Sequence, residues 1–254
     1  MYYNDEKHFK GLNGYEIGNI WYPRVTSIVN IKAKPALYRF YGELNNFAEG
    51  ESIKKVSANE GTLVHETSEA ILKGEDVDID PTVAPAIKAL RAFLEKTKIN
   101  VDSEWVEKRV VNYNERYAGT IDSLAIIDGK FGVLDIKTSQ AIYRDYNLQT
   151  SAYMAALQDQ FKNLQTRWIL RIDQVQKCLK CGAIRRTKGG REKIRTPRNN
   201  GVVVCSPDQH EWSDMQGEIE LQEFPYWYDD YHAFLGAKKL WEWENDYWLK
   251  RIGY

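Results

Sequence analysis

The chain has 254 residues, of which 43% are hydrophobic and 28% are charged, and its formal net charge is −1. This composition excludes wholesale disorder, and the length suits one large domain, which we expect to span residues 1–254. No apolar run approaches the ~20 residues of a membrane span, and the polar start does not fit a secretory signal. We therefore expect a cytoplasmic protein, or one of the host cytoplasm if a phage encodes the chain, with no membrane partner.

The first part of the chain predicts helices. Proline opens a helical segment over residues 35–47, and a second helix is expected over about 58–73, where Gly74 ends it. A third helix is predicted after Pro81, because apolar residues recur there at helical spacing: Ala86, Ile87, Leu90, Phe93 and Leu94. Residues of about 23–98 should therefore form a helical N-terminal part.

The middle of the chain changes to the pattern of strands. Residues 117–127 and 130–137 read as two strands joined by Asp128-Gly129, a typical two-residue hairpin turn. Further elements are expected as a helix over 145–161, a strand over 167–175, a strand over 201–205 and a C-terminal helix over 226–249. Together, these helices and strands predict the α/β (α+β) class. The core should span about 101–176, with helices that flank a central mixed sheet, and a C-terminal strand and helix should span about 201–254.

The predicted hairpin places two carboxylates opposite each other. If Asp128 and Gly129 form the turn, directly paired residues have numbers that sum to 257, and Asp122 and Asp135 meet this condition. Their Cβ atoms are then ~5 Å apart on one face, from which Lys137 also emerges. Because two carboxylates this close repel each other, the pair requires a shared proton or a bound cation.

Such a pair beside a lysine favours metal-assisted chemistry. Carboxylate oxygens suit Mg²⁺ or Mn²⁺, and the lysine can orient or deprotonate a water that attacks a phosphodiester. The alternative is an ordinary surface hairpin. Apolar neighbours on the same face disfavour that alternative: Leu124, Ile126, Phe131 and Val133.

Four short motifs occur in order along the chain: Gly61-Thr62-Leu63-Val64-His65, Gly119-Thr120-Ile121-Asp122, Leu134-Asp135-Ile136-Lys137-Thr138-Ser139 and Gln149-Thr150-Ser151-Ala152-Tyr153. This ordered set resembles the PD-(D/E)xK nucleases. More narrowly, it resembles the RecB-like branch, which includes phage, CRISPR-associated and mitochondrial genome-maintenance exonucleases. The resemblance implies a restriction-endonuclease-like core.

The resemblance also implies roles for individual residues. It implies that Mg²⁺ or Mn²⁺ is bound by His65, Asp122, Asp135 and the backbone carbonyl of Ile136. It implies catalytic roles for Asp122, Asp135 and Lys137, and contacts to DNA or support of the site for Gln149 and Tyr153. Taken alone, His65 could be an ordinary half-buried histidine and Tyr153 a core residue. Glu107, on the strand before the hairpin, is a candidate for supporting the metal ligands.

The function implied by the resemblance is a metal-dependent deoxyribonuclease. We expect an exonuclease that acts on DNA ends or single-stranded DNA, with DNA as the partner. One alternative is a structure-selective endonuclease of the same fold. Another is a non-catalytic DNA-binding or scaffold protein with a nuclease-like core, although the intact Asp122, Asp135 and Lys137 argue against it.

One segment concentrates positive charge. Residues 177–198 contain nine basic residues and one acid, a charge of +8 in 22 residues. We expect a basic insertion over about 177–200, with a loop from Ala183 to Asn200, that binds DNA phosphates without reading sequence. A solvated loop without a ligand is the alternative. The candidate phosphate contacts are Arg185, Arg186, Lys188 and Arg191.

The three cysteines flank this insertion. They cannot all pair, and Cys178 and Cys181 have the spacing of a zinc knuckle. With Cys205 and His210 they could form a Cys₃His site whose structural Zn²⁺ staples the base of the insertion. The alternative is three free thiols, with Cys205 as a buried strand residue. An iron–sulfur cluster is not expected, because CRISPR-associated relatives use a cysteine before the nuclease core and this chain has none there.

Overall fold

A computed structural model describes residues 3–197 and 204–254 of the chain. Its helices are α1 (Glu6–Asn13), α2 (Val25–Val29), α3 (Pro35–Gly42), α4 (Phe47–Leu72), α5 (Ala84–Lys96), the short 3₁₀-helix η1 (Ser103–Trp105), α6 (Asp145–Leu157), α7 (Tyr228–Glu244) and α8 (Asp246–Arg251). Its strands are β1 (Gly14–Ile17), β2 (Ile20–Pro23), β3 (Ile99–Val101), β4 (Lys108–Asn112), β5 (Tyr117–Ile121), β6 (Ser123–Ile127), β7 (Lys130–Lys137), β8 (Thr166–Lys177), β9 (Ile184–Lys188), β10 (Arg191–Arg195) and β11 (Gln216–Glu223).

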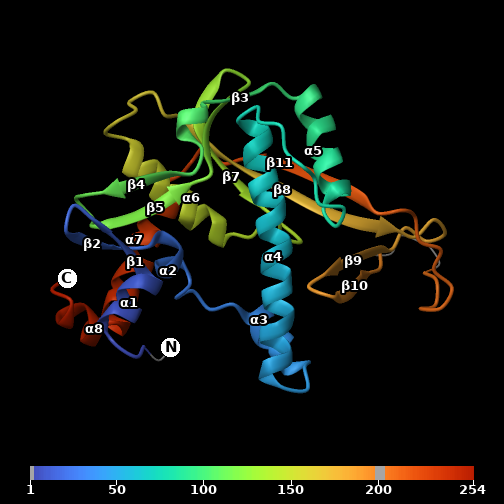
Figure 1. The fold of residues 1–254 in the computed structure, drawn as a ribbon, viewed down its shortest axis with the longest axis horizontal. Coiled ribbons are helices and arrows are strands. Elements are labelled where there is room, and N and C mark those ends of the chain that lie inside the picture. Colours follow the sequence, from blue (N-terminus) through green and yellow to red (C-terminus); the bar gives the residue numbers. More distant parts are fainter. Residues whose placement is uncertain (1–2, 198–203) are drawn as a thin grey trace.

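A mixed sheet forms the centre of the fold (Figure 1). Within the described residues, seven strands lie in the order β10-β9-β8-β7-β6-β3, with β11 paired to β8. Strands β7 and β8 run parallel, whereas β6 and β7 are antiparallel. The long strand β8 pairs with β7 near its start and with β9 at its end, so it connects the core to the β9–β10 hairpin. The predicted α/β class, with a central mixed sheet and a helical N-terminal part, is confirmed.

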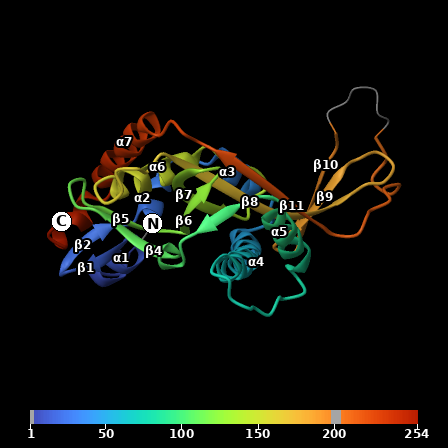
Figure 2. The ribbon, with the colours of Figure 1, turned by 90° about the horizontal axis from the view of Figure 1, so that it is seen from above.

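Helices cover both faces of the sheet. Leu124 and Val133 pack into one buried cluster with residues of α6 and α7, whereas Ala125 and Leu134 pack into a second cluster with residues of α4 and α5. Seen from above, α4 and α5 lie on one side of the sheet and α6 and α7 on the other (Figure 2). Alternate residues of each strand therefore enter different cores, as expected where both faces of a sheet are buried. No helix of the described residues is long and apolar enough to cross a membrane.

The helical boundaries follow local capping signals, but the second helix is longer than predicted. Helix α4 starts at Phe47, well before residue 58, because the side chain of Asn46 accepts a hydrogen bond from the backbone N–H of Glu49 at 2.9 Å. The helix ends as predicted before Gly74, whose φ of +77° favours glycine. Residues of this helix between Lys54 and Glu69 line the cleft described below.

Three other expectations are corrected by the tertiary contacts. The strand predicted over 117–127 breaks at Asp122 into β5 and β6, and β5 pairs with β4 while β6 pairs with β7. The predicted basic loop contains an antiparallel hairpin, β9–β10, whose two turn residues Gly189 and Gly190 both have positive φ. The predicted C-terminal helix is interrupted at Asn245, between α7 and α8.

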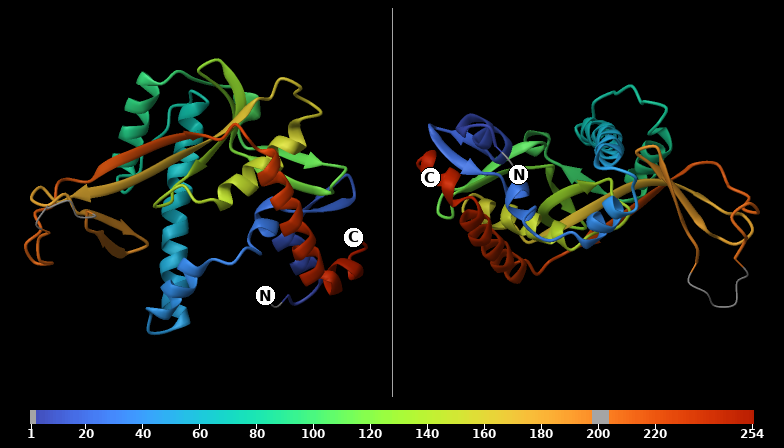
Figure 3. Two further views of the ribbon diagram at one scale, coloured as in Figure 1. Left: turned by 180° about the vertical axis from the view of Figure 1, so that it is seen from behind. Right: turned by 90° about the horizontal axis from the view of Figure 1, so that it is seen from below.

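Some elements have weak sequence signals. The strand expected over 201–205 lies largely outside the described residues, and the strand that pairs with β8 after the hairpin is β11. The sequence pattern predicts no strand over residues 216–223. Helix α1 and the β1–β2 hairpin also have no counterpart among the predicted elements. They lie at the same end of the molecule as the C-terminal helices, opposite the β9–β10 hairpin (Figure 3).

A buried ion pair holds α7 to the sheet. Arg167 of β8 is fully buried, and its Nη2 forms an ion pair with Asp230 in the first turn of α7. Replacement of Asp230 by alanine leaves an uncompensated buried guanidinium. We expect Asp230→Ala to lower the free energy of unfolding by about 3 kcal/mol, measured by urea denaturation. The matched control is Asp229→Ala, an exposed acid in the same helical turn. Equal losses in the two variants would show that the pair does not stabilise the fold.

Candidate metal centre

Four elements meet at the end of strand β7. Helix α4 approaches from one face of the sheet and helix α6 from the other, and the break between β5 and β6 lies beside β7. Each element supplies one part of the set predicted from the sequence motifs. The structure brings these residues together: His65 from α4, Asp122 from the β5–β6 break, Asp135, Ile136 and Lys137 from β7, and Gln149 and Tyr153 from α6.

The hairpin has the predicted register, but it ends one pair earlier. Ser123 opposes Leu134, and the turn at Asp128-Gly129 has positive φ at both residues, as a type I′ turn requires. The next pair would join Asp122 to Asp135. Instead the chain bends at Asp122, whose Oδ2 accepts a hydrogen bond from the backbone N–H of Ile136 at 2.5 Å. The two carboxylates are therefore neighbours at the end of the hairpin, outside a regular ladder.

Asp135 is fully buried and incompletely hydrogen-bonded. Its Oδ1 accepts a hydrogen bond from Gln149 Nε2 at 3.2 Å, and its Oδ2 lies 2.6 Å from Lys137 Nζ. The contact to Lys137 is an ion pair without hydrogen-bond geometry, so Oδ2 has no hydrogen-bond donor among the described residues. Burial raises the pKa of Asp135 to about 6, and the charge of Asp122 adds to this effect while Lys137 opposes it. A cation at Oδ2 would offset the desolvation of this oxygen.

His65 lies between two carboxylates. Its Nε2 is 3.1 Å from Asp122 Oδ2, and its Nδ1 contacts Glu69 one helical turn further along α4. Burial lowers the pKa of His65, but the contacts with Asp122 and Glu69 outweigh burial and raise it to about 10. A metal ligand must be the neutral imidazole, so metal binding at this histidine releases a proton.

Two glutamates belong to this centre that the motif analysis did not place there. Glu69 follows His65 by four residues on one helical face, a spacing that could have identified it. Glu107 is predicted only as a support for the metal ligands. In the structure, one carboxylate oxygen of Glu107, one ring nitrogen of His65 and one carboxylate oxygen of Asp122 all lie within 4.8 Å of one another. Its φ of +55° is unusual for a glutamate, and its N–H donates to the carbonyl of Asp122 at 3.0 Å. Burial and the neighbouring Glu69 raise the pKa of Glu107 to about 7.

The centre opens into a cleft of about 910 Å³. The cleft is lined by His65 and three acidic residues (Glu66, Glu69 and Glu107) and by four basic residues (Lys54, Lys137, Arg186 and Lys188). Asp122 and Asp135 are not among the lining residues. Gln149 and Tyr153 do not line the cleft. Tyr153 is only 2% exposed, and Gln149 donates to its hydroxyl at 3.0 Å, so these two residues support Asp135 from behind.

Only half of the basic residues predicted to bind DNA reach the cleft. Arg186 and Lys188 line it, and both donate to the carbonyl of Thr138, next to Lys137. Arg185 instead lies over the ring of Trp212 at 4.7 Å, and Arg191 pairs with Glu43 at 3.1 Å. Of the four candidate phosphate contacts, Arg186 and Lys188 are therefore the two that line the cleft, and DNA binding by any of the four stays a prediction. Side chains of β9 alternate between two faces, so Arg186 and Lys188 share one face and Arg185 lies on the other.

Two motif glycines allow close approach around the centre. A Cβ on Gly61 of α4 would lie 2.9 Å from Thr138 Oγ1, and a Cβ on Gly119 of β5 would lie 2.4 Å from the ring of Tyr153. Both distances are shorter than a carbon atom can occupy without displacing its neighbour. The glycines thus let α4 and α6 approach the sheet closely enough for His65 and Gln149 to reach the two aspartates.

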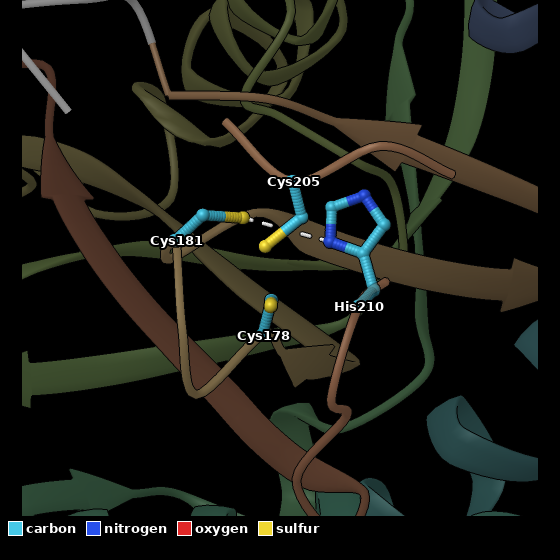
Figure 4. Close-up of side chains that lie close together, drawn as sticks. All are labelled: Cys178, Cys181, Cys205 and His210. Carbon is cyan, nitrogen blue, oxygen red and sulfur yellow. Dashed lines mark hydrogen bonds between the residues drawn. The ribbon is translucent and has the colours of Figure 1, made fainter. Parts of the chain in front are cut away.

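A second cluster of ligand-type side chains lies beyond β8. Cys178, Cys181, Cys205 and His210 point toward a common space (Figure 4), and their sulfur and ring nitrogen atoms lie within 4.8 Å of one another. The structure therefore brings together all four residues predicted as a zinc site. Burial opposes ionisation of Cys178, but hydrogen bonds from the backbone of Cys181 and from His210 lower its pKa to about 5.

The pKa of His65 predicts a pH dependence in metal-free protein. Because the folded state raises this pKa from 6.5 to about 10, the bound proton stabilises the fold fully below pH 6.5, and this contribution is lost as the pH rises toward about 10. In EDTA, the destabilisation caused by His65→Gln should therefore shrink across this range, as measured by urea denaturation at several pH values. The exposed His232→Gln serves as the control. A difference that stays constant between pH 6.5 and 10 would contradict a protonated His65.

Comparisons with known proteins give little help. No known protein-family profile matches the chain, and no curated protein matches it. A solved structure described as "Crystal structure of SSO0001" is 13% identical, with a TM-score of 0.34, over 86% of this chain and 73% of that chain. At this identity and TM-score the likeness assigns neither a family nor a function to this chain.

Proposed function

We propose that this protein is a Mg²⁺- or Mn²⁺-dependent deoxyribonuclease of the PD-(D/E)xK type, acting on DNA ends or single-stranded DNA. One observation carries the proposal. His65, Asp122, Asp135 and Lys137 come from separate motifs, yet they contact one another at the edge of one cleft. A purely structural role would not require two buried carboxylates, a histidine and a lysine at the same point.

The residues present fit a divalent cation. The donor set of one imidazole, two carboxylates and the carbonyl of Ile136 is rich in oxygen, which suits Mg²⁺ or Mn²⁺. Ligand atoms of His65 and Asp122 already lie within 4.8 Å of each other, and Asp135 Oδ2 is buried beside Lys137 Nζ at 2.6 Å. When bound, the ion would supply Lewis acidity and a water of lowered pKa. Glu107 is close enough to join the set through its carboxylate or a water.

Lys137 can contribute directly to hydrolysis. Its amino group is held beside Asp135 and 5.3 Å from the ring centre of Tyr146, so its position is fixed on the cleft. From there its three N–H donors can hold the attacking water and offset the negative charge that develops on a phosphate. Gln149 and Tyr153 act on this step only by orienting Asp135.

The basic residues of the cleft suit a nucleic-acid backbone. Lys54 from α4 and Arg186 and Lys188 from β9 line the same cavity as His65 and Ile136 of the candidate metal ligands. Phosphate contacts of this kind position a strand without reading its bases. The positive charges would thus bring a phosphodiester to the two aspartates, which alone would repel it.

The activity is tested with linear and covalently closed circular DNA, in Mg²⁺ or Mn²⁺ and in EDTA. We expect degradation of linear DNA, loss of activity in EDTA, and loss of activity with weaker Mn²⁺ binding in Asp122→Asn and Asp135→Asn. Cleavage of the closed circle would assign an endonuclease instead. A folded protein that binds DNA but cleaves neither substrate with any divalent ion would overturn the proposal in favour of a scaffold.

The role of Lys137 is tested separately. Lys137→Ala should lower turnover on linear DNA by about 10²-fold or more, while binding of DNA and Mn²⁺ is retained, because the lysine acts on the reacting groups. The matched control is Lys130→Ala, an exposed lysine at the other end of the same strand. If Lys137→Ala loses DNA binding but keeps normal single-turnover rates, the lysine captures substrate and takes no part in the chemistry.

A further inference from the structure

The chain beyond β8 folds back so that four metal-ligand side chains converge. Cys178 and Cys181 come from the turn that follows β8, and Cys205 and His210 come from the segment before β11 (Figure 4). Residues from two segments separated by the β9–β10 hairpin thus share one small space. The sulfur and nitrogen atoms lie within 4.8 Å of one another, which leaves room for a single ion between them.

One pair of these atoms has the spacing expected at tetrahedral zinc. The Sγ of Cys181 and the Nδ1 of His210 are 3.5 Å apart. Two ligands bound to one zinc ion at ~2.3 Å for sulfur and ~2.0 Å for nitrogen are ~3.5 Å apart in tetrahedral geometry. Three thiolates and one imidazole also complete the coordination, so no position stays open for a substrate. Soft thiolate ligands do not favour the Mg²⁺ or Mn²⁺ suited to the aspartate centre.

Backbone hydrogen bonds build this site in advance. The N–H of Gly182 donates to the carbonyl of Cys178 at 2.9 Å, and Gly182 has a φ of +71° that favours glycine in the turn. The N–H of Leu179 donates to the carbonyl of Glu211 at 2.8 Å and so fixes the second segment against the first. Cys178 and Cys181 are only 3% and 4% exposed.

The cluster is connected to strand β9 by short contacts. The ring of His210 stacks on the ring of Trp212, with 4.7 Å between the ring centroids. The guanidinium carbon of Arg185 also lies over Trp212, 4.7 Å from the ring centroid. Strand β9 begins directly after the knuckle and carries Arg186 and Lys188 to the carbonyl of Thr138. The cluster therefore lies next to the start of β9, the strand that supplies Arg186 and Lys188 to the cleft.

We propose that Cys178, Cys181, Cys205 and His210 bind a structural zinc ion that anchors the β9–β10 hairpin. The anchored hairpin keeps Arg186 and Lys188 in the wall of the cleft. The zinc site itself is independent of the nuclease function, whereas its effect on DNA binding rests on that proposed function. The protein would thus hold two metals of different chemistry, one oxygen-bound at the aspartates and one sulfur-bound at the root of the hairpin.

The zinc is tested first by elemental analysis of the full chain purified without chelator. We expect about one zinc per chain in the wild type and in Asp122→Asn, and much less in Cys181→Ser and His210→Ala. The control His232→Ala, an exposed histidine on α7, should keep the zinc. Replacement by Co²⁺ should give the visible absorption of a tetrahedral thiolate site. Wild-type protein that contains no zinc and binds none, or that contains iron instead, overturns the site whatever the nuclease assay shows.

The anchoring role is tested by limited proteolysis and by DNA binding. Trypsin should cut within residues 184–195 several-fold faster in Cys181→Ser and in zinc-depleted wild type than in zinc-loaded wild type. Binding of a DNA oligonucleotide should weaken in the same samples, with a smaller dependence on salt, because fewer phosphate contacts are held in place. Unchanged proteolysis after zinc removal would overturn the anchoring role. Faster proteolysis with unchanged DNA binding would keep the zinc anchor and reject its link to the proposed function.

Discussion

The repulsion between two buried carboxylates governs the arrangement of this protein. Asp122 and Asp135 are 7% and 0% exposed, and they lie side by side at the end of the β6–β7 hairpin. Buried like charges are unstable unless positive or hydrogen-bonding groups compensate them. Three separate elements provide that compensation, through His65 of α4, Lys137 of β7 and Gln149 of α6. The packing of both helices on the sheet can thus be understood as the support of one charged centre.

This constraint also explains why the sheet is interrupted beside the centre. A continuous strand through Asp122 would pair it with Asp135 in a regular ladder. The break between β5 and β6 instead turns Asp122 toward the N–H of Ile136 and the ring of His65. The positive φ of Glu107 brings a further carboxylate to the same point. Uncommon backbone conformations often mark functional sites, because surrounding packing must maintain them.

Strand β8 links the aspartate centre to the cysteine cluster. Its first half pairs in parallel with β7, which carries Asp135, and its end leads into Cys178 and strand β9. The hairpin then returns to the centre, where Arg186 and Lys188 hold the carbonyl of Thr138. Two distant parts of the chain therefore contact each other through one strand and one hairpin, and a change at either end can reach the cleft.

The sequence alone determined the hairpin register, the α/β class and the residues of the aspartate centre. The register and the class depend on local patterns, namely a two-residue turn and the periodicity of apolar residues. The residues of the aspartate centre depend in addition on the resemblance of four ordered motifs to a known nuclease family. Only the tertiary structure decided that the Glu107 carboxylate joins the ligand atoms of His65 and Asp122, that Arg185 and Arg191 turn away from the cleft, and that the basic segment forms a hairpin. The reason is physical: side-chain partners from distant segments are set by how α4, β4 and β9 pack, and no local propensity encodes that packing.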